Sequence, residues 1–292
     1  MPGRTHRLLL LSILGFACSN PLCQAQYPAW PDPIAGDVLP YAASGLSHGP
    51  LLGNPTSHSV RVWVRTKEAG PFRVRYGKSL PPDSKWKSVE STTRQVDDLV
   101  SFVEIRSVDA NTRYFYLVEV DGKAADLRMD FSDPWPSFRT LPDESTFVDP
   151  VNNPDGRFNF AFSVGHCASQ DPGRSGGQYT STPAYDSILR WHHDEIAFGI
   201  VNGDVIYEEM RDGTIDGVRD NYKLYFSRGR SFSNLFRRIP AMFTFDDHDV
   251  GWDIHGCGQV GLGEGRHLIR DVGLKAYEDY LSWANPGGTH RG

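Results

Sequence analysis

Apolar and polar residues alternate along an early part of the chain in the pattern of β-strands. Valine occupies every second position within residues 59–65, and residues 72–76 and 100–108 alternate in a similar way. A period of two is typical of a half-buried strand. Residues 114–120 form a further apolar run, which ends in a hairpin-type Asp-Gly turn at 121–122. Several short strands with no helical pattern between them predict a β-sandwich.

The predicted sandwich contains no cluster of catalytic residue types. Residues 111–116 resemble the corner before a late strand in fibronectin type III domains, where a tyrosine hydroxyl bonds back to nearby backbone. We therefore expect residues 48–141 to form an N-terminal sandwich of the fibronectin III or immunoglobulin kind, preceded by an extended leader at 26–47. His48 and His58 are isolated in the sequence. The sandwich is expected to be a scaffold or, at most, a binding surface.

The pattern changes after residue 157, where apolar runs alternate with helical periodicity. Residues 142–157 are polar and rich in proline, as expected of a linker. Beyond them, residues 158–292 are predicted to form part of an α/β domain. Its predicted strands are 158–164, 196–201 and 240–245, and its predicted helices are 183–193, 217–228 and 267–283. This order implies parallel strands that are buried on both faces.

Each of these three strands runs into a polar cluster at its C-terminal end. The clusters are Gly165-His166-Cys167, Gly203-Asp204-Val205-Ile206-Tyr207 and Asp246-Asp247-His248-Asp249. In open α/β sheets, ligands bind at the edge that such strand ends form. The sequence therefore predicts a site at this edge.

The residue types in the three clusters are those that bind metal ions. Neighbouring acids repel one another at neutral pH, so their burial requires a cation or strong hydrogen bonds. Carboxylates and imidazole suit hard or borderline ions, although a solvated turn also explains Asp and Gly here. Cys167 can supply a thiolate, Tyr207 a phenolate that favours ferric iron, and Asp204 a bridge between two ions. Taken singly, each has an ordinary interpretation as a core or turn residue. Clustered ions are common in catalysis at phosphorus.

The N-terminus has the features of an export signal. Residues 1–25 hold two arginines, an apolar core at 8–17 and small residues before a cleavage point after Ala25. The core is too short for a membrane span, which requires roughly 20 residues. A lipid anchor on Cys18 or Cys23 is the alternative. We expect an exported protein, secreted or periplasmic, without a transmembrane segment.

Charge and cysteine content narrow the functional classes. The 292-residue chain carries a net charge of −6, and the predicted signal holds two arginines and no acidic residue. An acidic exported chain without a basic run is a poor candidate for binding nucleic acid or anionic membranes. Its length allows two domains. Cys167 and Cys257 remain after removal of the signal, and they either form a disulfide or leave a thiolate with a function.

Three segments resemble, in order, motifs of the PhoD-like alkaline phosphatase D family, which belongs to the calcineurin-like metallophosphatases. These segments are residues 165–170, 203–208 and 246–251. Residues 47–53 look like the segment by which that family enters its N-terminal sandwich. The resemblance covers most of the chain after the signal, and it implies a secreted phosphoesterase that acts on small phosphate monoesters or diesters.

The resemblance also implies roles for individual residues. Cys167, Asp204 and Tyr207 match positions that bind iron in the family, and Asp204 is shared with a second metal, calcium. Asp247 matches a ligand of the second metal, and His248 matches the donor of a proton to the leaving group. Other divalent metals also suit these residues. The implied reaction is attack on phosphorus by a metal-activated hydroxide.

The chain departs from the family in two places. Asp253 is only a loose match to a further metal-facing Asn or Asp. The family's last motif, a Gly-Asp-x-His that completes the metal site, has no counterpart in the sequence. We therefore expect the chain to correspond to part of the metallophosphatase domain, as a fragment or a truncated product, and its activity alone is left open.

Weaker motifs suggest other functions. Ser175 lies in a Gly-x-Ser-x-Gly pattern, but no predicted strand leads into it, as a serine-hydrolase elbow requires. Residues 256–261 fit the dinucleotide fingerprint but follow a polar loop. His192 and His193 can cap the end of a helix or bind metal. The remaining alternative is a non-catalytic secreted binding protein in which the α/β part is a remnant.

Overall fold

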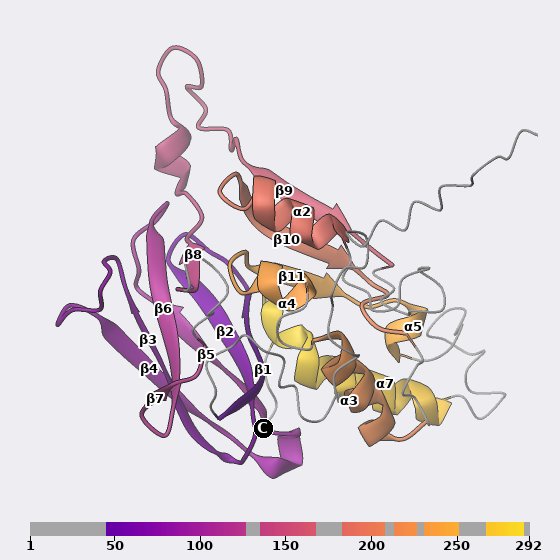
Figure 1. The fold of residues 1–292 in the computed structure, drawn as a ribbon. Coiled ribbons are helices and arrows are strands. Elements are labelled where there is room, and N and C mark those ends of the chain that lie inside the picture. The colour runs from indigo at the N-terminus through magenta and orange to yellow at the C-terminus, as the bar shows by residue number, and fades with distance from the viewer. Residues whose placement is uncertain are drawn as a thin grey trace, which may run out of the picture.

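The described part of the chain consists of two β-sheets with helices packed on one of them (Figure 1). The computed structural model describes residues 45–126, 135–167, 183–207, 213–226, 231–250 and 267–288. In this part, no helix is both long and apolar enough to cross a membrane.

The smaller sheet is antiparallel. Its strands run in the order β4 (Lys87–Thr93), β3 (Gly70–Gly77), β6 (Arg113–Val120) and β7 (Lys123–Ala124), with β8 (Ser137–Arg139) paired to β6. The turn between β6 and β7 places Asp121 and Gly122 at φ 52° and 70°, as the Asp-Gly signal predicts. The predicted tyrosine corner is confirmed, since the backbone N–H of Asp109 donates to the Tyr114 hydroxyl at 2.9 Å.

The larger sheet joins the two halves of the chain. Its six strands are β5 (Val100–Arg106), β2 (Ser59–Thr66), β1 (Leu46–Gly53), β11 (Ala241–Thr244), β10 (Ile196–Asn202) and β9 (Ala161–Gly165). The first three are antiparallel, and β1 then pairs in parallel with β11 through Gly53 and Ala241. The parallel order of β9, β10 and β11 is confirmed. A single continuous sheet therefore links strands from the early part of the chain to the strands that carry the predicted site.

The two sheets enclose one apolar core. Val60, Val62 and Val64 of β2 are buried there with Val74 of β3 and Tyr116 of β6. The period-two pattern thus identified the inward face of β2 correctly. The prediction that this strand is only half-buried is wrong, because all eight residues of β2 are buried. Its other face lies beneath the helices of the later half.

Within the described residues, the helices follow the predicted order with two additions. They are α2 (Pro183–Trp191), α3 (Ile215–Tyr225), α4 (Ser231–Phe236), α5 (Asp247–Val250) and α7 (His267–Tyr280), with 3₁₀ turns at Gln95–Asp97, Glu144–Phe147 and Ser282–Ala284. The short helices α4 and α5 were not predicted. Helix α3 begins where the Thr214 side chain accepts a hydrogen bond from the Gly217 N–H at 3.1 Å.

Aromatic residues form the second core, between the larger sheet and the helices. Trp63 of β2 stacks on Trp283 with ring centroids 6.2 Å apart and meets Phe226 edge-on at 5.9 Å. Tyr280 of α7 lies 5.6 Å from the same ring. The early and late halves of the chain thus share a packed interface.

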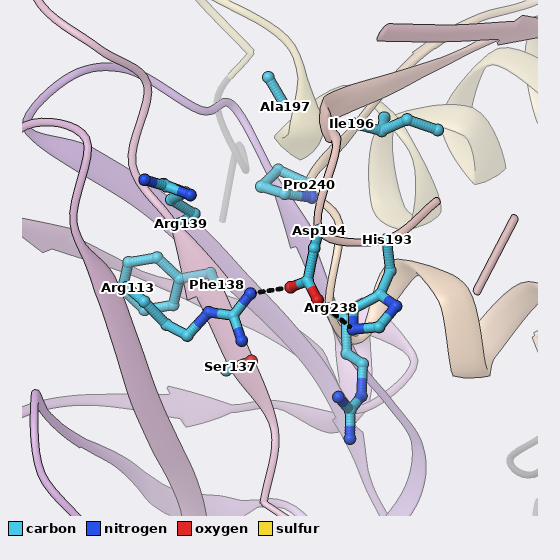
Figure 2. Close-up of a pocket in the computed structure, with 10 residues that line it drawn as sticks. All are labelled: Arg113, Ser137, Phe138, Arg139, His193, Asp194, Ile196, Ala197, Arg238 and Pro240. Carbon is cyan, nitrogen blue, oxygen red and sulfur yellow. Dashed lines mark hydrogen bonds and ion pairs between the residues drawn. The ribbon is translucent and has the colours of Figure 1, made fainter. Parts of the chain in front are cut away.

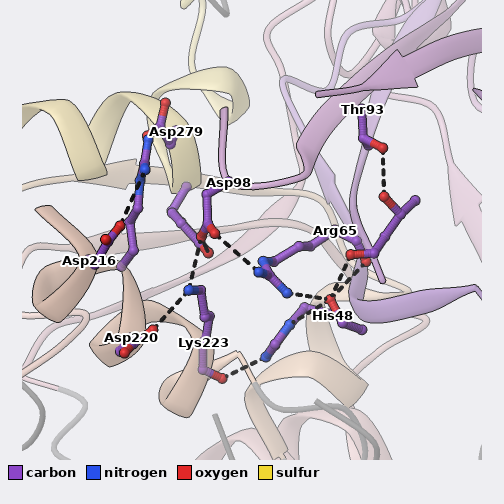
Figure 3. Close-up of polar contacts among 12 residues, drawn as sticks. His48, Arg65, Thr93, Asp98, Asp216, Asp220, Lys223 and Asp279 are labelled. Atoms are coloured by element: carbon purple, nitrogen blue, oxygen red, sulfur yellow. Dashed lines mark hydrogen bonds and ion pairs between the residues drawn. The ribbon is translucent and has the colours of Figure 1, made fainter. Parts of the chain in front are cut away.

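Polar contacts also connect the early and late halves of the chain (Figure 3). The Asp98 carboxylate accepts hydrogen bonds from Arg65 and Tyr280 and pairs with Lys223 at 3.3 Å. Burial alone raises the pKa of Asp98, but Arg65 and Lys223 outweigh it and hold the pKa below its ordinary value. His48 donates from Nε2 to the Lys223 carbonyl at 2.9 Å.

Among the described residues, helices cover only one face of the parallel strands. The predicted burial on both faces is therefore wrong for β9. Helix α4 covers the face of Gly199, where a Cβ would lie 3.0 Å from the Phe236 ring. On the opposite face, Phe160, Phe162 and Val164 are 41%, 49% and 61% exposed. Parallel strands usually need a layer on each side, and only one is present among these residues.

Candidate metal centre

The three parallel strands end at the same edge, and the loop after each strand carries a predicted ligand. Cys167 follows β9, Asp204 follows β10 and Asp247 begins α5 after β11. The Cys167 thiol lies 3.2 Å from Oδ2 of Asp204. The predicted convergence of separate strand ends on one place is thus present in the structure. It follows from parallel pairing, which aligns the C-terminal ends of all three strands.

The chain turns sharply where it leaves β9 and β10. Cys167 and Asp204 have φ values of 55° and 50°, in the left-handed region that residues other than glycine seldom adopt. Gly203 precedes Asp204 at φ 85°, and a Cβ there would lie 2.6 Å from the Asp246 Cβ. Such conformations cost on the order of 1–3 kcal/mol each and gather at functional sites. The backbone therefore bends to direct the two side chains toward each other.

The two oxygens of the Asp204 carboxylate have different surroundings. Oδ2 lies 3.2 Å from the Cys167 thiol and 3.4 Å from the Tyr207 hydroxyl, both of which can donate to it. Oδ1 is buried and has no hydrogen-bond partner among the described residues. A buried carboxylate oxygen without a partner is unfavourable unless a cation compensates its charge. This oxygen therefore fits a metal ion.

Asp247 and His248 complete a group of possible ligands around Asp204. One ligand atom from each of the three residues lies within 4.8 Å of the others. The His248 ring also lies against Tyr207, with ring centroids 4.5 Å apart. Two carboxylates and an imidazole are suitable ligands for a borderline divalent ion or iron. The residues present thus fit the metal chemistry predicted from the sequence.

The pKa values of the site residues show the same need for positive charge. Burial raises the pKa of Asp247, and the nearby Asp204 carboxylate adds to this rise, while the charge of His248 opposes it. Burial and the hydrogen bond to Asp204 raise the pKa of the Cys167 thiol. Burial, followed by the charge of Asp204, raises the pKa of Tyr207 well above its ordinary value. A bound cation would oppose all three shifts, because it stabilises the deprotonated form of each group.

Sequence reasoning assigned no role to Asp249, the last residue of the Asp-Asp-His-Asp motif. Its side chain is fully buried, and burial raises its pKa to about 7. The backbone N–H groups of Val205, Ile206 and Asp246 donate to its carboxylate. The only signal in the sequence was its place in an acidic run, which does not show which acid points inward.

Several predicted features fall outside the described residues. They are the export signal, the Ser175 motif, Asp253, Cys257 and the glycine-rich run at 256–261. Cys167 has a free thiol in the described structure. Its pairing with Cys257 stays untested, as do the serine-hydrolase and dinucleotide motifs.

His192 and His193 directly follow α2, in the segment that leads into the beginning of β10. His192 is 3.1 Å from Glu195, and His193 is 3.4 Å from Asp194. His193 and Asp194 line a small pocket where Arg113 pairs with Asp194 (Figure 2). This pocket lies at the beginning of β10, whereas Asp204 follows the end of that strand. The two histidines are thus not part of the candidate metal centre.

Comparisons with known proteins show similarity at the level of the fold. Residues 43–137 match a family described as a domain of unknown function (DUF7800). No curated protein matches the sequence. A structure of PhoD is 16% identical, with a TM-score of 0.56, over 90% of this chain and 49% of that one.

A second similar structure is the purple acid phosphatase PPD1 of yellow lupin. It is 13% identical, with a TM-score of 0.52, over 81% of this chain and 41% of that one. The chain thus spans less than half the length of either structure. The comparisons establish a fold similar to those of PhoD and the purple acid phosphatase, while membership of the PhoD-like family stays a prediction.

Proposed function

We propose that this chain provides a metal-dependent phosphoesterase site for small phosphate monoesters or diesters. The observation that carries the proposal is the buried Asp204 oxygen without a partner, surrounded by candidate ligands from three strand ends. A fold similar to that of a phosphatase supports the choice of phosphoesters as substrates. The chain spans under half of each similar structure. That this chain catalyses the reaction without further residues is therefore also proposed.

The candidate ligands divide into two sets by their chemistry. Cys167, Tyr207 and Asp204 would hold an iron ion, since thiolate and phenolate suit a strongly Lewis-acidic metal. Asp247 would hold a second ion, which the resemblance to the PhoD-like family implies is calcium. Asp204 would be shared between the iron and this second ion. Ions bound there would supply the positive charge that stabilises a phosphoryl group during displacement.

His248 is proposed as the donor of a proton to the departing alkoxide. Its ring is partly exposed beside Tyr207, and it can reach both the site and solvent. Its place in the group with Asp204 and Asp247 allows a second role, as a metal ligand. The two roles predict different metal content and different losses of activity for a variant that lacks the imidazole ring.

We expect His248→Gln to keep the bound metal and to lose activity mainly on alkyl phosphates. A poor leaving group needs a proton from a general acid, which contributes about 10²–10⁴-fold, whereas a nitrophenyl group leaves with little help. The measurement is kcat for an alkyl ester and a nitrophenyl ester, with metal content determined in parallel. Equal losses on both esters together with loss of metal would assign His248 as a ligand.

The proposed function is tested by metal analysis and hydrolysis assays on the full chain. We expect near-stoichiometric iron after loading, hydrolysis of a nitrophenyl phosphate or bis-nitrophenyl phosphate, and loss of both in Cys167→Ala and Asp204→Asn. Ser175→Ala is the matched control, and it should keep full activity. Loss of activity in Ser175→Ala would support the serine-hydrolase alternative. A folded chain that binds no metal would support a non-catalytic binding protein.

A further inference from the structure

Asp249 connects the two loops that carry the candidate ligands. It is fully buried, and its Oδ1 accepts hydrogen bonds from the N–H groups of Val205 at 2.9 Å and Ile206 at 3.2 Å. Its Oδ2 accepts from the Asp246 N–H at 3.0 Å. Val205 and Ile206 directly follow Asp204, and Asp246 directly precedes Asp247. One carboxylate thus binds the backbone next to a ligand on each loop.

Among the described residues, the backbone pairing of the sheet does not itself connect the two loops. Strands β10 and β11 are paired only from Gly199–Ala241 to Asn202–Thr244, so the ladder ends before Asp204 and Asp247. The left-handed turn at Gly203 and Asp204 takes the following N–H groups out of the sheet. Buried N–H groups need an acceptor, and the Asp249 carboxylate supplies it.

We propose that Asp249 is a positioning residue, which fixes the spacing between Asp204 and Asp247 and so determines metal affinity. The inference rests on the proposed function, because it concerns the same metal centre. A carboxylate suits the task since it only accepts hydrogen bonds, and three N–H donors face it. Asparagine has nearly the same shape, but its NH₂ group cannot accept from the Asp246 N–H.

The test compares two buried aspartates by Co²⁺ titration of the full chain, followed by visible absorption. Asp249→Asn should weaken Co²⁺ binding by about 10–100-fold, the range found when groups that orient metal ligands are removed. Asp279→Asn is the matched control. Asp279 is also buried, but it lies in α7 and pairs with Arg219 of α3 and Lys275 of α7. Its replacement should lower stability and leave Co²⁺ affinity unchanged.

Asp204→Asn separates failure of the inference from failure of the proposed function. If Asp204→Asn binds Co²⁺ as tightly as the wild type, no metal centre exists at this edge and both ideas fall. If Asp204→Asn abolishes binding while Asp249→Asn binds with wild-type affinity, only the positioning role of Asp249 is wrong.

A measurement on the wild-type chain covers the case in which Asp249→Asn does not fold. If Asp249 couples the loops to the metal centre, Zn²⁺ must in turn slow hydrogen exchange at the N–H groups of Val205 and Ile206. The N–H of Val62, in the sandwich core, should keep its rate. Unchanged exchange at Val205 and Ile206 on saturation with Zn²⁺ would overturn the proposal.

Discussion

At the scale of single residues, Asp204 is placed where its charge is unfavourable in the absence of a cation. Its Oδ1 atom is buried without a partner among the described residues, and its backbone lies in the left-handed region. Both features reduce the stability of a chain that holds no metal. A residue that lowers stability and is nevertheless surrounded by candidate ligands is expected to serve binding.

We predict that Asp204→Asn makes the metal-free chain more stable, by about 1 kcal/mol, because it removes the charge of a carboxylate whose buried Oδ1 has no hydrogen-bond partner among the described residues. The same change should abolish stabilisation by metal. Urea unfolding of both proteins, with chelator and with added Co²⁺, measures the two effects. A variant less stable than the wild type in chelator would show that the carboxylate is already compensated within the protein.

The residues of the site differed in how far the sequence could predict them. Cys167, Asp204 and Asp247 were predicted together because parallel strands bring their C-terminal ends to one edge. The role of Asp249 could not be predicted, since it depends on which way a four-residue helix turns its side chains. The position of His248 within reach of Asp204 likewise depends on α5, a helix too short to leave a periodic signal.

At the scale of secondary-structure elements, the junction of β1 with β11 determines how the two halves meet. Gly53 is the residue of β1 that pairs with Ala241, and it also faces the 3₁₀ turn Ser282–Ala284. A Cβ at Gly53 would lie 2.6 Å from the Ala284 Cβ and 2.7 Å from its Cα. Only glycine allows the strand and the turn to approach so closely.

Replacement of Gly53 by valine should therefore destabilise the chain by about 1–3 kcal/mol, the usual range for overpacking of a closely packed region. Gly70→Ala is the control, because a Cβ there meets nothing within 4 Å. It should change the urea midpoint little. If Gly53→Val unfolds at the wild-type midpoint, the junction is less tightly packed than the structure indicates.

Local periodicity predicted most elements but not the way they associate. The alternating valines of β2 identified the face toward the smaller sheet, whereas burial of the opposite face depends on Trp63 packing against Trp283, more than 200 residues later. Short elements such as β8 and α4 are set by their neighbours and leave no pattern of their own. Exposure of Phe160 and Phe162 could not be predicted, because apolar runs are also typical of buried strands.

At the scale of the whole molecule, the interface between the halves contains a histidine that must stay neutral. Burial lowers the pKa of His48 well below 6.5, and the charge of Arg65 lowers it further. Lys223 adds to this effect, while Asp98 and the hydrogen bond to the Lys223 carbonyl oppose it. Ser47 lies 3.2 Å from the other ring nitrogen. The folded chain thus holds His48 without its proton at pH values where the unfolded chain takes one up.

The consequence is a loss of stability in acid that starts near the ordinary histidine pKa. Above pH 6.5 both states are neutral at His48, so its contribution is constant. As the pH falls below 6.5, only the unfolded state binds a proton, and the free energy of unfolding decreases. We expect His48 to account for a decrease of about 1 kcal/mol between pH 6.5 and 5.5.

His48→Gln keeps a donor for the Lys223 carbonyl and should lack this component. The difference between the two proteins in urea unfolding across this range isolates His48 from other titrating groups. If the free energies of unfolding of the two proteins changed with pH in the same way, protonated His48 would be accommodated in the folded chain. The interface would then tolerate another positive charge beside Arg65 and Lys223.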